Sequence, residues 1–362
     1  MQPFQPPLST ASLPPVGGSL GPLPAHFVVE EIPAYLPSGE GDHVYVFVQK
    51  TLQNTVDVAR RIAQVAGVQQ RDVGYAGLKD RKAVTRQWFS LPLRSKPVAE
   101  WELGPDIVVL ESSRHKNKLR TGHLNGNRFI LTLEGVTAGG LERAEAIAAR
   151  LRDPGIPNYF GPQRFGRGGS NLDAGLAWLQ SMQNRAELPE GETGARRGDR
   201  RGPRSRFDDK MLPSVVQSEI FNRYVAARLA RPEPLLPGEV VRLDGSSRCF
   251  VVENAEKELP RLESGDIHLT GPMIGPKTVQ AEALAGELEA LIVRDFGLDE
   301  GALEQLGKNA PGARRDLFLK PTDLVVRSLT EDSLELTFGL PAGSYATQVL
   351  REMTHGEWHE PR

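Results

Sequence analysis

Residues Gly77–Ser90 read GLKDRKAVTRQWFS and carry the strongest indication of fold and function in the chain. One carboxylate, Asp80, stands among four cations, follows a glycine and precedes an aromatic pair. Nearby positive charge favours the ionised form of a carboxylate and lowers its pKa, so Asp80 is a candidate nucleophile or base. The alternative is a solvated turn whose surface ion pairs contribute little energy. The same cations are suited to holding a polyanion.

The 362-residue chain has a formal net charge of −2, but its charges are unevenly distributed. Positive residues gather in Ala76–Ser90, Glu111–Arg128 and Arg196–Arg206, whereas Glu282–Glu304 is acidic. Such segregation creates a local positive field on a nearly neutral protein, and phosphates respond to the local field. One basic run is typical of a solvated loop. Three runs around a candidate reactive carboxylate favour RNA or DNA binding.

Several classes of protein are disfavoured by what the sequence lacks. The single cysteine, Cys249, excludes an internal disulfide framework and a multi-thiolate metal site. Only His355 and His359 have a close helical spacing among the histidines, and no metal-binding motif accompanies them. A phosphate-binding loop and a Gly-x-Ser-x-Gly motif are also missing. Without a membrane-length apolar run or signal peptide, we expect a soluble, cytoplasmic protein that uses no metal or cofactor.

Hydrophobic periodicity predicts alternating strands and helices. The expected strands are Phe27–Pro33, His43–Gln49, Asp106–Leu110, Arg128–Glu134, Glu239–Leu243, Cys249–Val252, Asp323–Leu329 and Ser333–Phe338. The expected helices follow Asn54 up to Gly67, span Leu141–Leu151, Ser214–Leu229 and Gln280–Arg294, and begin at Ser344. The β-rich pattern stops after Gly155 and returns after Asn309, which is typical of a domain with an insertion. We therefore expect an irregular leader at 1–24, a discontinuous domain at 25–156 and 310–362, and an inserted domain at 157–309.

Three further groups of residues have both a structural and a functional interpretation. Phe129 is expected in the core of its strand, although its ring is also suited to stacking on a base, and the amide of Asn127 is suited to holding a carboxylate. The aromatic residues of Asn158–Gly166 fit a packed hinge and an RNA-facing surface equally well. Arg351 borders the apolar stripe of the last helix. It is either a surface arginine or the counter-ion of a reactive carboxylate.

Taken together, these segments resemble the TruD family of tRNA pseudouridine synthases, with similar motifs in the same order between Phe27 and Glu352. The similar segments are Phe27–Pro33, His43–Lys50 with Asn54 and Thr55, Gly77–Gln87, Lys118–Phe129, Asn158–Gly166 and Leu340–Glu352. The leader, the Arg196–Arg206 loop and the last residues fall outside the resemblance.

The resemblance implies an α+β fold. A pseudouridine-synthase catalytic domain with a mixed, largely antiparallel sheet would be interrupted by an inserted α/β TRUD domain. It also implies that a monomer isomerises a uridine of tRNA, at position 13 in the D stem of a tRNA-Glu type, without a metal or small-molecule cofactor.

The same resemblance implies roles for individual residues. Asp80 corresponds to the catalytic aspartate, Phe129 to the aromatic residue that stacks on the target uracil, Asn127 to a support for Asp80, and Arg351 to the basic partner. The residues expected to bind RNA are the cations of the basic runs and of the glycine-rich segment: Lys79, Arg81, Lys82, Arg86, Arg114, Lys116, Lys118, Arg120, Arg164 and Arg167.

The chemistry leaves alternatives open. Isomerisation gains and loses no atoms, so it requires neither redox nor phosphate chemistry. An ionised carboxylate can attack the sugar or the ring, or it can remove the 2′ proton, and the sequence does not choose between them. The rival function is a tRNA-binding protein or RNA chaperone without turnover. An RNA hydrolase using Asp80 is disfavoured because no histidine or metal-binding group stands near it in the sequence.

Overall fold

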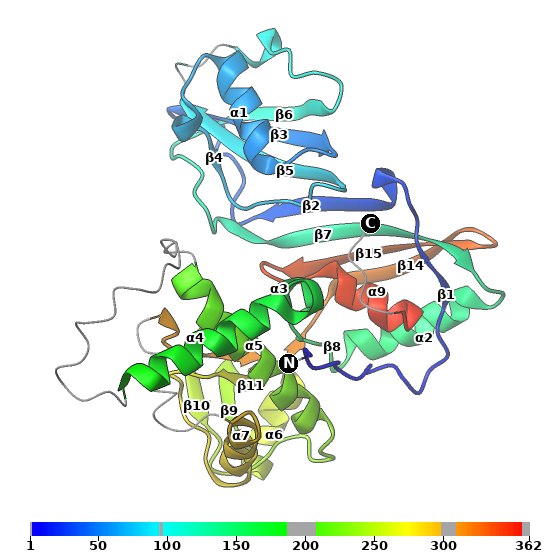
Figure 1. Ribbon diagram of the computed structural model, residues 1–362. Coiled ribbons are helices and arrows are strands. Elements are labelled where there is room, and N and C mark those ends of the chain that lie inside the picture. The colour runs from blue at the N-terminus through cyan, green and yellow to red at the C-terminus, as the bar shows by residue number, and fades with distance from the viewer. Residues whose placement is uncertain (1, 93, 95–96, 187–207, 298–308, 357–362) are drawn as a thin grey trace. The chain divides into compact units, whose positions relative to one another are not determined.

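The computed structural model describes residues 2–92, 94, 97–186, 208–297 and 309–356 (Figure 1). The chain forms two compact units, which we call the sheet unit (Ser9–Ile156 and Lys320–Arg362) and the inserted unit (Met1–Leu8 and Pro157–Leu319). The return to the sheet unit thus falls at Lys320 rather than at 310. The fold is mixed α and β, with a mixed and mostly antiparallel main sheet.

The sheet unit contains a nine-stranded sheet. Its main path is β14 (Thr322–Thr330), β15 (Ser333–Pro341), β7 (Leu124–Val136), β2 (Phe27–Pro33), β5 (Val84–Pro92), β3 (His43–Thr51) and β6 (Ile107–His115). The pairing of β2 with β5 is parallel, and the other pairings along this path are antiparallel. In addition, β1 (Gly17–Leu20) pairs with β7 and β4 (Gly74–Tyr75) pairs with β5. β1 lies within the expected leader, so that stretch is not irregular throughout.

Three helices pack on this sheet. α1 (Thr55–Ala66) begins after Asn54 and ends at Gly67, as predicted, because Gly67 adopts the left-handed conformation (φ 69°) that terminates helices. Its buried face, which includes Val58 and Ile62, packs against Val46 and Val48 of β3. α2 (Gly140–Arg152) and α9 (Ala346–Thr354) lie beside each other against the β14–β15 end (Figure 1).

The inserted unit combines helices with a four-stranded sheet. The sheet has the order β10 (Cys249–Val251), β9 (Val240–Leu243), β11 (Ile267–Met273) and β12 (Ala313–Asp316), and β8 (Ile156–Pro157) pairs with β13 (Phe318–Leu319). The helices are α3 (Pro162–Phe165), α4 (Ser170–Ala186), α5 (Asp208–Leu229), α6 (Ala255–Ser264) and α7 (Ala283–Asp295). Short 3-10 helices occupy Pro24–His26, Gln70–Asp72 and Val98–Glu100 in the sheet unit and Arg167–Gly169 in the inserted unit.

The predicted elements are present, and β2 has the predicted bounds. Most of the others differ by a few residues at their ends, and β6 extends into the basic run as far as His115. The central strand β5 was not predicted. The other elements that were not predicted are the helices α3, α4 and α6 and the strands β1, β4, β8, β11, β12 and β13. α5 begins before the predicted Ser214, and Pro213 lies inside the helix as its sixth residue, where a proline removes one intrahelical hydrogen bond.

Candidate active site

The strand register places candidate residues in one row on one face of the main sheet. Lys50 of β3 pairs with Thr85 of β5, and Thr85 pairs with Val29 of β2. Val29 pairs with Phe129 of β7, which pairs with Phe338 of β15. Directly paired residues point to the same face of a sheet. We call the face that carries this row the site face.

The loop between β4 and β5 carries Asp80 and is anchored to the sheet unit by side chains. The amide of Gln87 on β5 donates to the Gly77 carbonyl (3.1 Å). The Lys79 N–H donates to the Thr55 hydroxyl (2.9 Å), and this hydroxyl donates to the Gln87 amide oxygen (2.9 Å). Thr55 is the first residue of α1, so the loop is fixed to both a strand and a helix. Asp80 itself is exposed.

Lys79, the residue before Asp80, is buried. Its Nζ lies 2.8 Å from Glu31 Oε2, and the two side chains are 3% and 0% exposed. The other Glu31 oxygen accepts the N–H of Trp88 (3.3 Å). Glu31 is paired across the strands with Asn127, next to the row described above. The ammonium of Lys79 is thus paired within the protein, and its contact with RNA stays a prediction.

Lys50 is a component of this site that sequence reasoning missed. Its side chain is fully buried, and its Nζ donates to the carbonyl oxygens of Gln53 (2.7 Å) and Asp80 (2.9 Å). Burial lowers the pKa of Lys50 to about 8; the nearby Asp80 carboxylate opposes this shift and Lys79 adds to it. A signal was present in the sequence: Lys50 shares its strand face with Val46 and Val48, where a lysine breaks an apolar pattern.

Phe129 is packed between two other phenylalanines. Its ring is stacked with Phe27 (centroids 6.4 Å apart) and with Phe338 (5.5 Å), and the residue is only 4% exposed. Packing against neighbouring residues therefore buries most of the surface of Phe129, as expected for a core residue. A base that stacks on Phe129 would therefore contact one ring of a cluster of three phenylalanines.

Two polar atoms on the site face have no hydrogen-bond partner among the described residues. They are Asn127 Oδ1 and Thr85 Oγ1, and both are buried. Buried polar groups are normally paired in folded proteins, so an unpaired one in a candidate site points to a ligand or water that completes it. Asn127 thus lies where the sequence places it, at the start of β7, with an unused acceptor.

Arg351 is half-buried on α9. Its neighbour Glu352 is buried and accepts hydrogen bonds from the backbone N–H groups of Ser9 (3.1 Å) and Thr10 (3.0 Å). Glu352 therefore ties the N-terminal segment to α9. The role of Arg351 as a partner of Asp80 stays a prediction.

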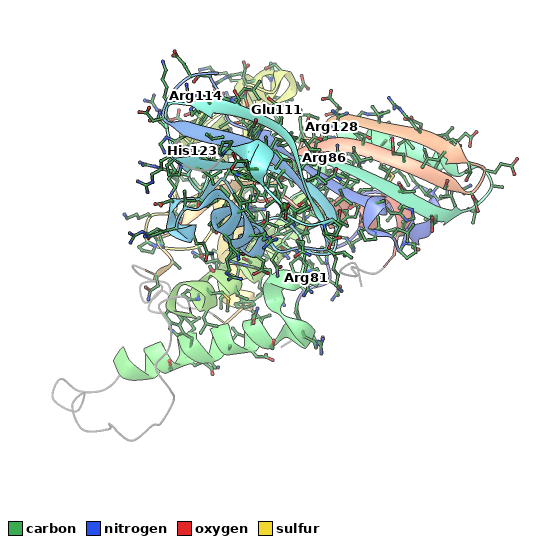
Figure 2. All side chains as sticks on the ribbon, turned by 90° about the horizontal axis from the view of Figure 1, so that it is seen from above. Arg81, Arg86, Glu111, Arg114, His123 and Arg128 are labelled. Carbon is green, nitrogen blue, oxygen red and sulfur yellow. The ribbon has the colours of Figure 1, made fainter. Side chains whose placement is uncertain are left out.

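The cations expected to bind RNA fall into different environments. Arg81, Lys82, Arg114, Lys116 and Arg120 are exposed. Arg86, in contrast, donates to Glu30 (3.0 Å) and Gln49 (3.0 Å). The register places Arg86, Glu30 and Arg128 in one row on the face opposite Phe129; the two arginines are labelled in Figure 2. Arg86 therefore does not line the site face, because neighbouring residues of a strand alternate between its two faces.

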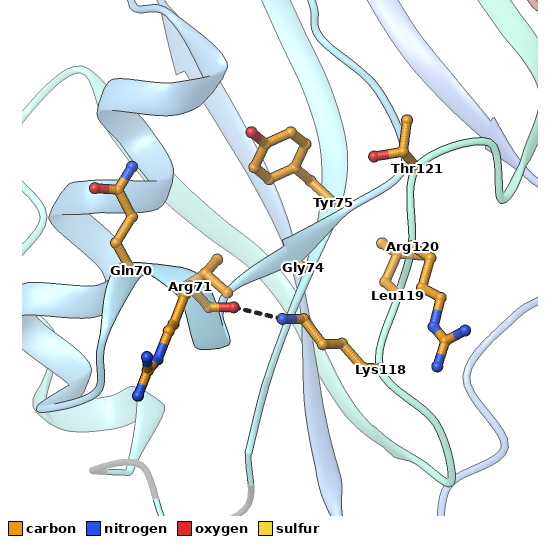
Figure 3. Close-up of a pocket in the computed structure, with 9 residues that line it drawn as sticks. Gln70, Arg71, Gly74, Tyr75, Lys118, Leu119, Arg120 and Thr121 are labelled. Atoms are coloured by element: carbon orange, nitrogen blue, oxygen red, sulfur yellow. Dashed lines mark hydrogen bonds between the residues drawn. The ribbon is translucent and has the colours of Figure 1, made fainter.

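A hollow of about 630 Å³ lies beside the strand that leads into the Asp80 loop. Lys118 extends across it to donate to the Arg71 carbonyl (2.6 Å), and the guanidinium groups of Arg71 and Arg120 point away from its centre (Figure 3). Its lining residues are Gln70, Arg71, Val73, Gly74, Tyr75, Lys118, Leu119, Arg120 and Thr121. Two cations of the predicted RNA-binding set, Lys118 and Arg120, thus border one hollow.

In the inserted unit the aromatic residues of Asn158–Gly166 belong mainly to packing. Tyr159 is 3% and Phe165 2% exposed. Arg164 donates to the hydroxyls of Ser214 (2.7 Å) and Ser218 (3.1 Å) of α5. These contacts favour the packed interpretation and occupy much of the donor capacity of Arg164. Of the remaining predicted cations, Arg167 is exposed, and the Arg196–Arg206 loop lies outside the described residues.

Two general observations concern the described part of the chain. No helix there is long and apolar enough to cross a membrane. No three His, Cys, Asp or Glu side chains within the same residues gather as metal ligands do.

The chain is similar to known proteins along almost its whole length. The family model described as "tRNA pseudouridine synthase D (TruD)" matches residues 7–179 and 209–353. The tRNA pseudouridine synthase D of Anaeromyxobacter dehalogenans (strain 2CP-C) is 41% identical over 98% of each chain. The protein of the same name from Thermus thermophilus is 37% identical over 96% of this chain and 91% of its own.

Similarity of the fold extends to a solved structure. The crystal structure of a Methanosarcina mazei protein assigned as tRNA pseudouridine synthase D superposes with a TM-score of 0.76 and covers 97% of this chain and 96% of its own, at 24% identity. The shared fold and the similarity along the chain therefore place this protein in the pseudouridine synthase class. The chain is a member of the tRNA pseudouridine synthase D (TruD) family.

Proposed function

We propose that this chain converts a uridine of tRNA to pseudouridine, with uridine 13 in the D stem of a tRNA-Glu type as its target, and that it acts as a monomer. Its family is one of tRNA pseudouridine synthases, which are isomerases. The observation that supports the proposal most is the exposed carboxylate of Asp80, carried by a loop that is fastened to the sheet at Gly77 and Lys79. A rigid support of this kind holds a reactive group in place.

Asp80 supplies the reactive carboxylate. The reaction breaks the bond between N1 of uracil and C1′ of the ribose, turns the base, and joins C5 to C1′. The proton lost from C5 is balanced by one gained at N1, so no atoms are gained or lost overall. The carboxylate acts either as a nucleophile at the sugar or ring, or as the base that removes the 2′ proton.

The surrounding residues bind and orient the substrate. The target base must leave its stack in the tRNA, at a cost of a few kcal/mol, and contacts with the protein offset this cost. The unused Asn127 Oδ1 is available to accept a hydrogen bond from the substrate. The ring of Phe129 forms the apolar wall, Arg351 is the counter-ion of Asp80, and the exposed cations hold the RNA backbone.

Tritium release from tRNA labelled at C5 of uridine tests the activity. Wild-type protein is expected to release tritium, and Asp80→Asn is expected to slow release on the order of 10⁴-fold while tRNA affinity is retained. Asp106→Asn, an exposed aspartate elsewhere in the sheet unit, serves as the control and should be fully active. Release that survives Asp80→Asn would remove Asp80 from the chemistry. Binding without any release would favour the RNA chaperone.

A second labelling experiment tests the position of the target. A tRNA that carries the label only at uridine 13 should release all of it, whereas a tRNA labelled at every other uridine should release none. Release from the second substrate would contradict uridine 13 as the target without affecting the assignment of the reaction.

A further inference from the structure

Lys50 is a buried cation whose two acceptors are both neutral. Its Nζ donates to the carbonyl oxygens of Gln53 and Asp80, and neither acceptor is a carboxylate. Burying a charge costs free energy that a carbonyl pair offsets only in part. At this position a methionine or leucine would fill the same space at a lower cost. A residue that is unfavourable for stability at a reactive site points to a functional role.

The two carbonyls belong to two different loops. Gln53 lies in the connection from β3 to α1, and Asp80 lies in the connection from β4 to β5. Lys50 therefore connects these two loops, although Asp80 is 30 residues away from it in the sequence. Other side chains hold Gly77 and Lys79, but the bond from Lys50 is made to Asp80 itself.

We propose that Lys50 is a positioning residue: its ammonium fixes the backbone of Asp80 so that the carboxylate projects toward the substrate, and its charge strengthens the hydrogen bonds that hold this backbone. The inference rests on the proposed function, and Lys50 itself does not contact substrate. Its position in the row with Thr85 and Phe129 brings this charge to the site face.

The charge of Lys50 is also the group that responds to pH. The charged groups that act on it are Asp80 and Lys79 from the loop. Lys79 is in turn paired with Glu31 of β2. The β5 neighbour of Lys50, Thr85, is neutral. Burial lowers the pKa of Lys50 to about 8, so the charge is lost at mildly alkaline pH. The neutral amine keeps hydrogen-bond donors, but its bonds to the two carbonyls are weaker than those of the ammonium. Turnover should therefore decline without disappearing.

Lys50→Met tests the proposal because methionine has similar length and no charge. We expect kcat to fall about 100-fold, as a displacement of about 1 Å does, whereas KM and tRNA affinity should change little. Thermal stability should be equal or higher, because the buried charge is gone. Lys257→Met, on the exposed surface of α6, is the matched control and should behave as wild type. Wild-type kcat in Lys50→Met would overturn the proposal.

The pH profile separates positioning from simple loss of structure. In the wild type, kcat should decline above about pH 8, and this decline should be absent in Lys50→Met. The folded pKa lies below the unfolded value of 10.5, so the unfolded state binds more protons between the two values. The contribution of Lys50 to stability therefore rises with pH in that window, while activity falls. An identical alkaline decline in Lys50→Met would assign it to another group and overturn the role of the charge.

Hydrogen exchange provides a readout that does not depend on activity. The Lys79 amide is bonded to the Thr55 hydroxyl and should exchange faster in Lys50→Met than in the wild type, whereas amides of β7 should be unaffected. If wild-type protein releases no tritium from tRNA, the proposed function fails. Faster exchange at Lys79 in Lys50→Met would still support the role of Lys50 in anchoring the Asp80 loop. Unchanged exchange at Lys79, Asp80 and Arg81 would overturn it.

Discussion

The ammonium of Lys79 lies 2.8 Å from the carboxylate of Glu31, and solvent reaches almost none of either side chain. Glu31 also accepts the N–H of Trp88, so this ion pair connects the Asp80 loop with β2 and β5. The next residue after Lys79 is exposed. One of two consecutive charged residues thus anchors the loop, and the other presents its carboxylate to solvent.

Breaking this ion pair should destabilise the sheet unit. Glu31→Gln leaves the Lys79 ammonium buried beside a neutral amide, and loss of one partner of a buried pair typically costs about 3–5 kcal/mol. The double variant Glu31→Gln with Lys79→Met should recover part of the loss, because no unpaired charge remains. A chain of two units does not guarantee a single unfolding transition, so the measurement is the melting temperature of the transition that belongs to the sheet unit.

An exposed ion pair of the same unit provides the control. Arg94 and Asp72 lie 3.1 Å apart, and the arginine side chain is 74% exposed. Asp72→Asn should cost less than about 1 kcal/mol, as surface pairs do. Equal losses in Asp72→Asn and Glu31→Gln would contradict the structural role of the buried pair.

The predictable parts of the fold are those encoded locally. The alternation of His43–Gln49 and the stop at Gly67 are set by neighbouring residues, and the sequence was sufficient for both. The burial of Lys79 was not predictable, because Glu31 is 48 residues away in the chain. The same reason applies to Arg86, one of the cations expected to bind RNA, because strand register turns its side chain to the face opposite Phe129. The sequence specifies the charge of a residue, but the direction of its side chain depends on the tertiary structure.

The aromatic character of Phe129 can be separated from its packing role. Phe129→Ala should lose about 3–5 kcal/mol of stability, because the residue is buried, and is therefore uninformative about turnover. Phe129→Leu retains an apolar side chain and should cost less than about 1.5 kcal/mol. If the ring contacts the uracil, turnover should fall about 5- to 150-fold, which corresponds to a stacking energy of about 1–3 kcal/mol.

Phe338 provides the matched substitution, since it packs against the same ring and is fully buried. Phe338→Leu should have a similar effect on stability and should retain most of the turnover. Equal loss of turnover in both leucine variants would indicate that Phe129 is only a core residue. Single-turnover measurements with saturating enzyme make the comparison independent of tRNA affinity.

Arg351 should control the acidic side of the activity profile if it is the counter-ion of Asp80. A fixed positive charge favours the ionised form of a carboxylate. Removing it in Arg351→Ala means that ionisation requires a higher pH, and the acidic limb of kcat/KM should move upward by about one pH unit or more. Arg351→Lys keeps a charge at acidic pH and should retain the wild-type limb. Arg150→Ala, on the exposed surface of α2, is the control, and a lower rate with an unmoved limb would exclude the pairing.

The exposed cations near the Asp80 loop should contribute to the salt dependence of tRNA binding. Each phosphate contact that is lost reduces the slope of log K against log salt by about 1. Arg81→Gln and Arg120→Gln should each produce this reduction, because both side chains are exposed and one of them borders the hollow beside β4. Arg327→Gln, on the exposed side of β14, should leave the slope unchanged. Since Arg81 and Arg120 lie on separate loops, the double variant should reduce the slope of log K against log salt by about 2. A weaker affinity with an unchanged slope would mean that these arginines stabilise the loops and do not contact phosphate.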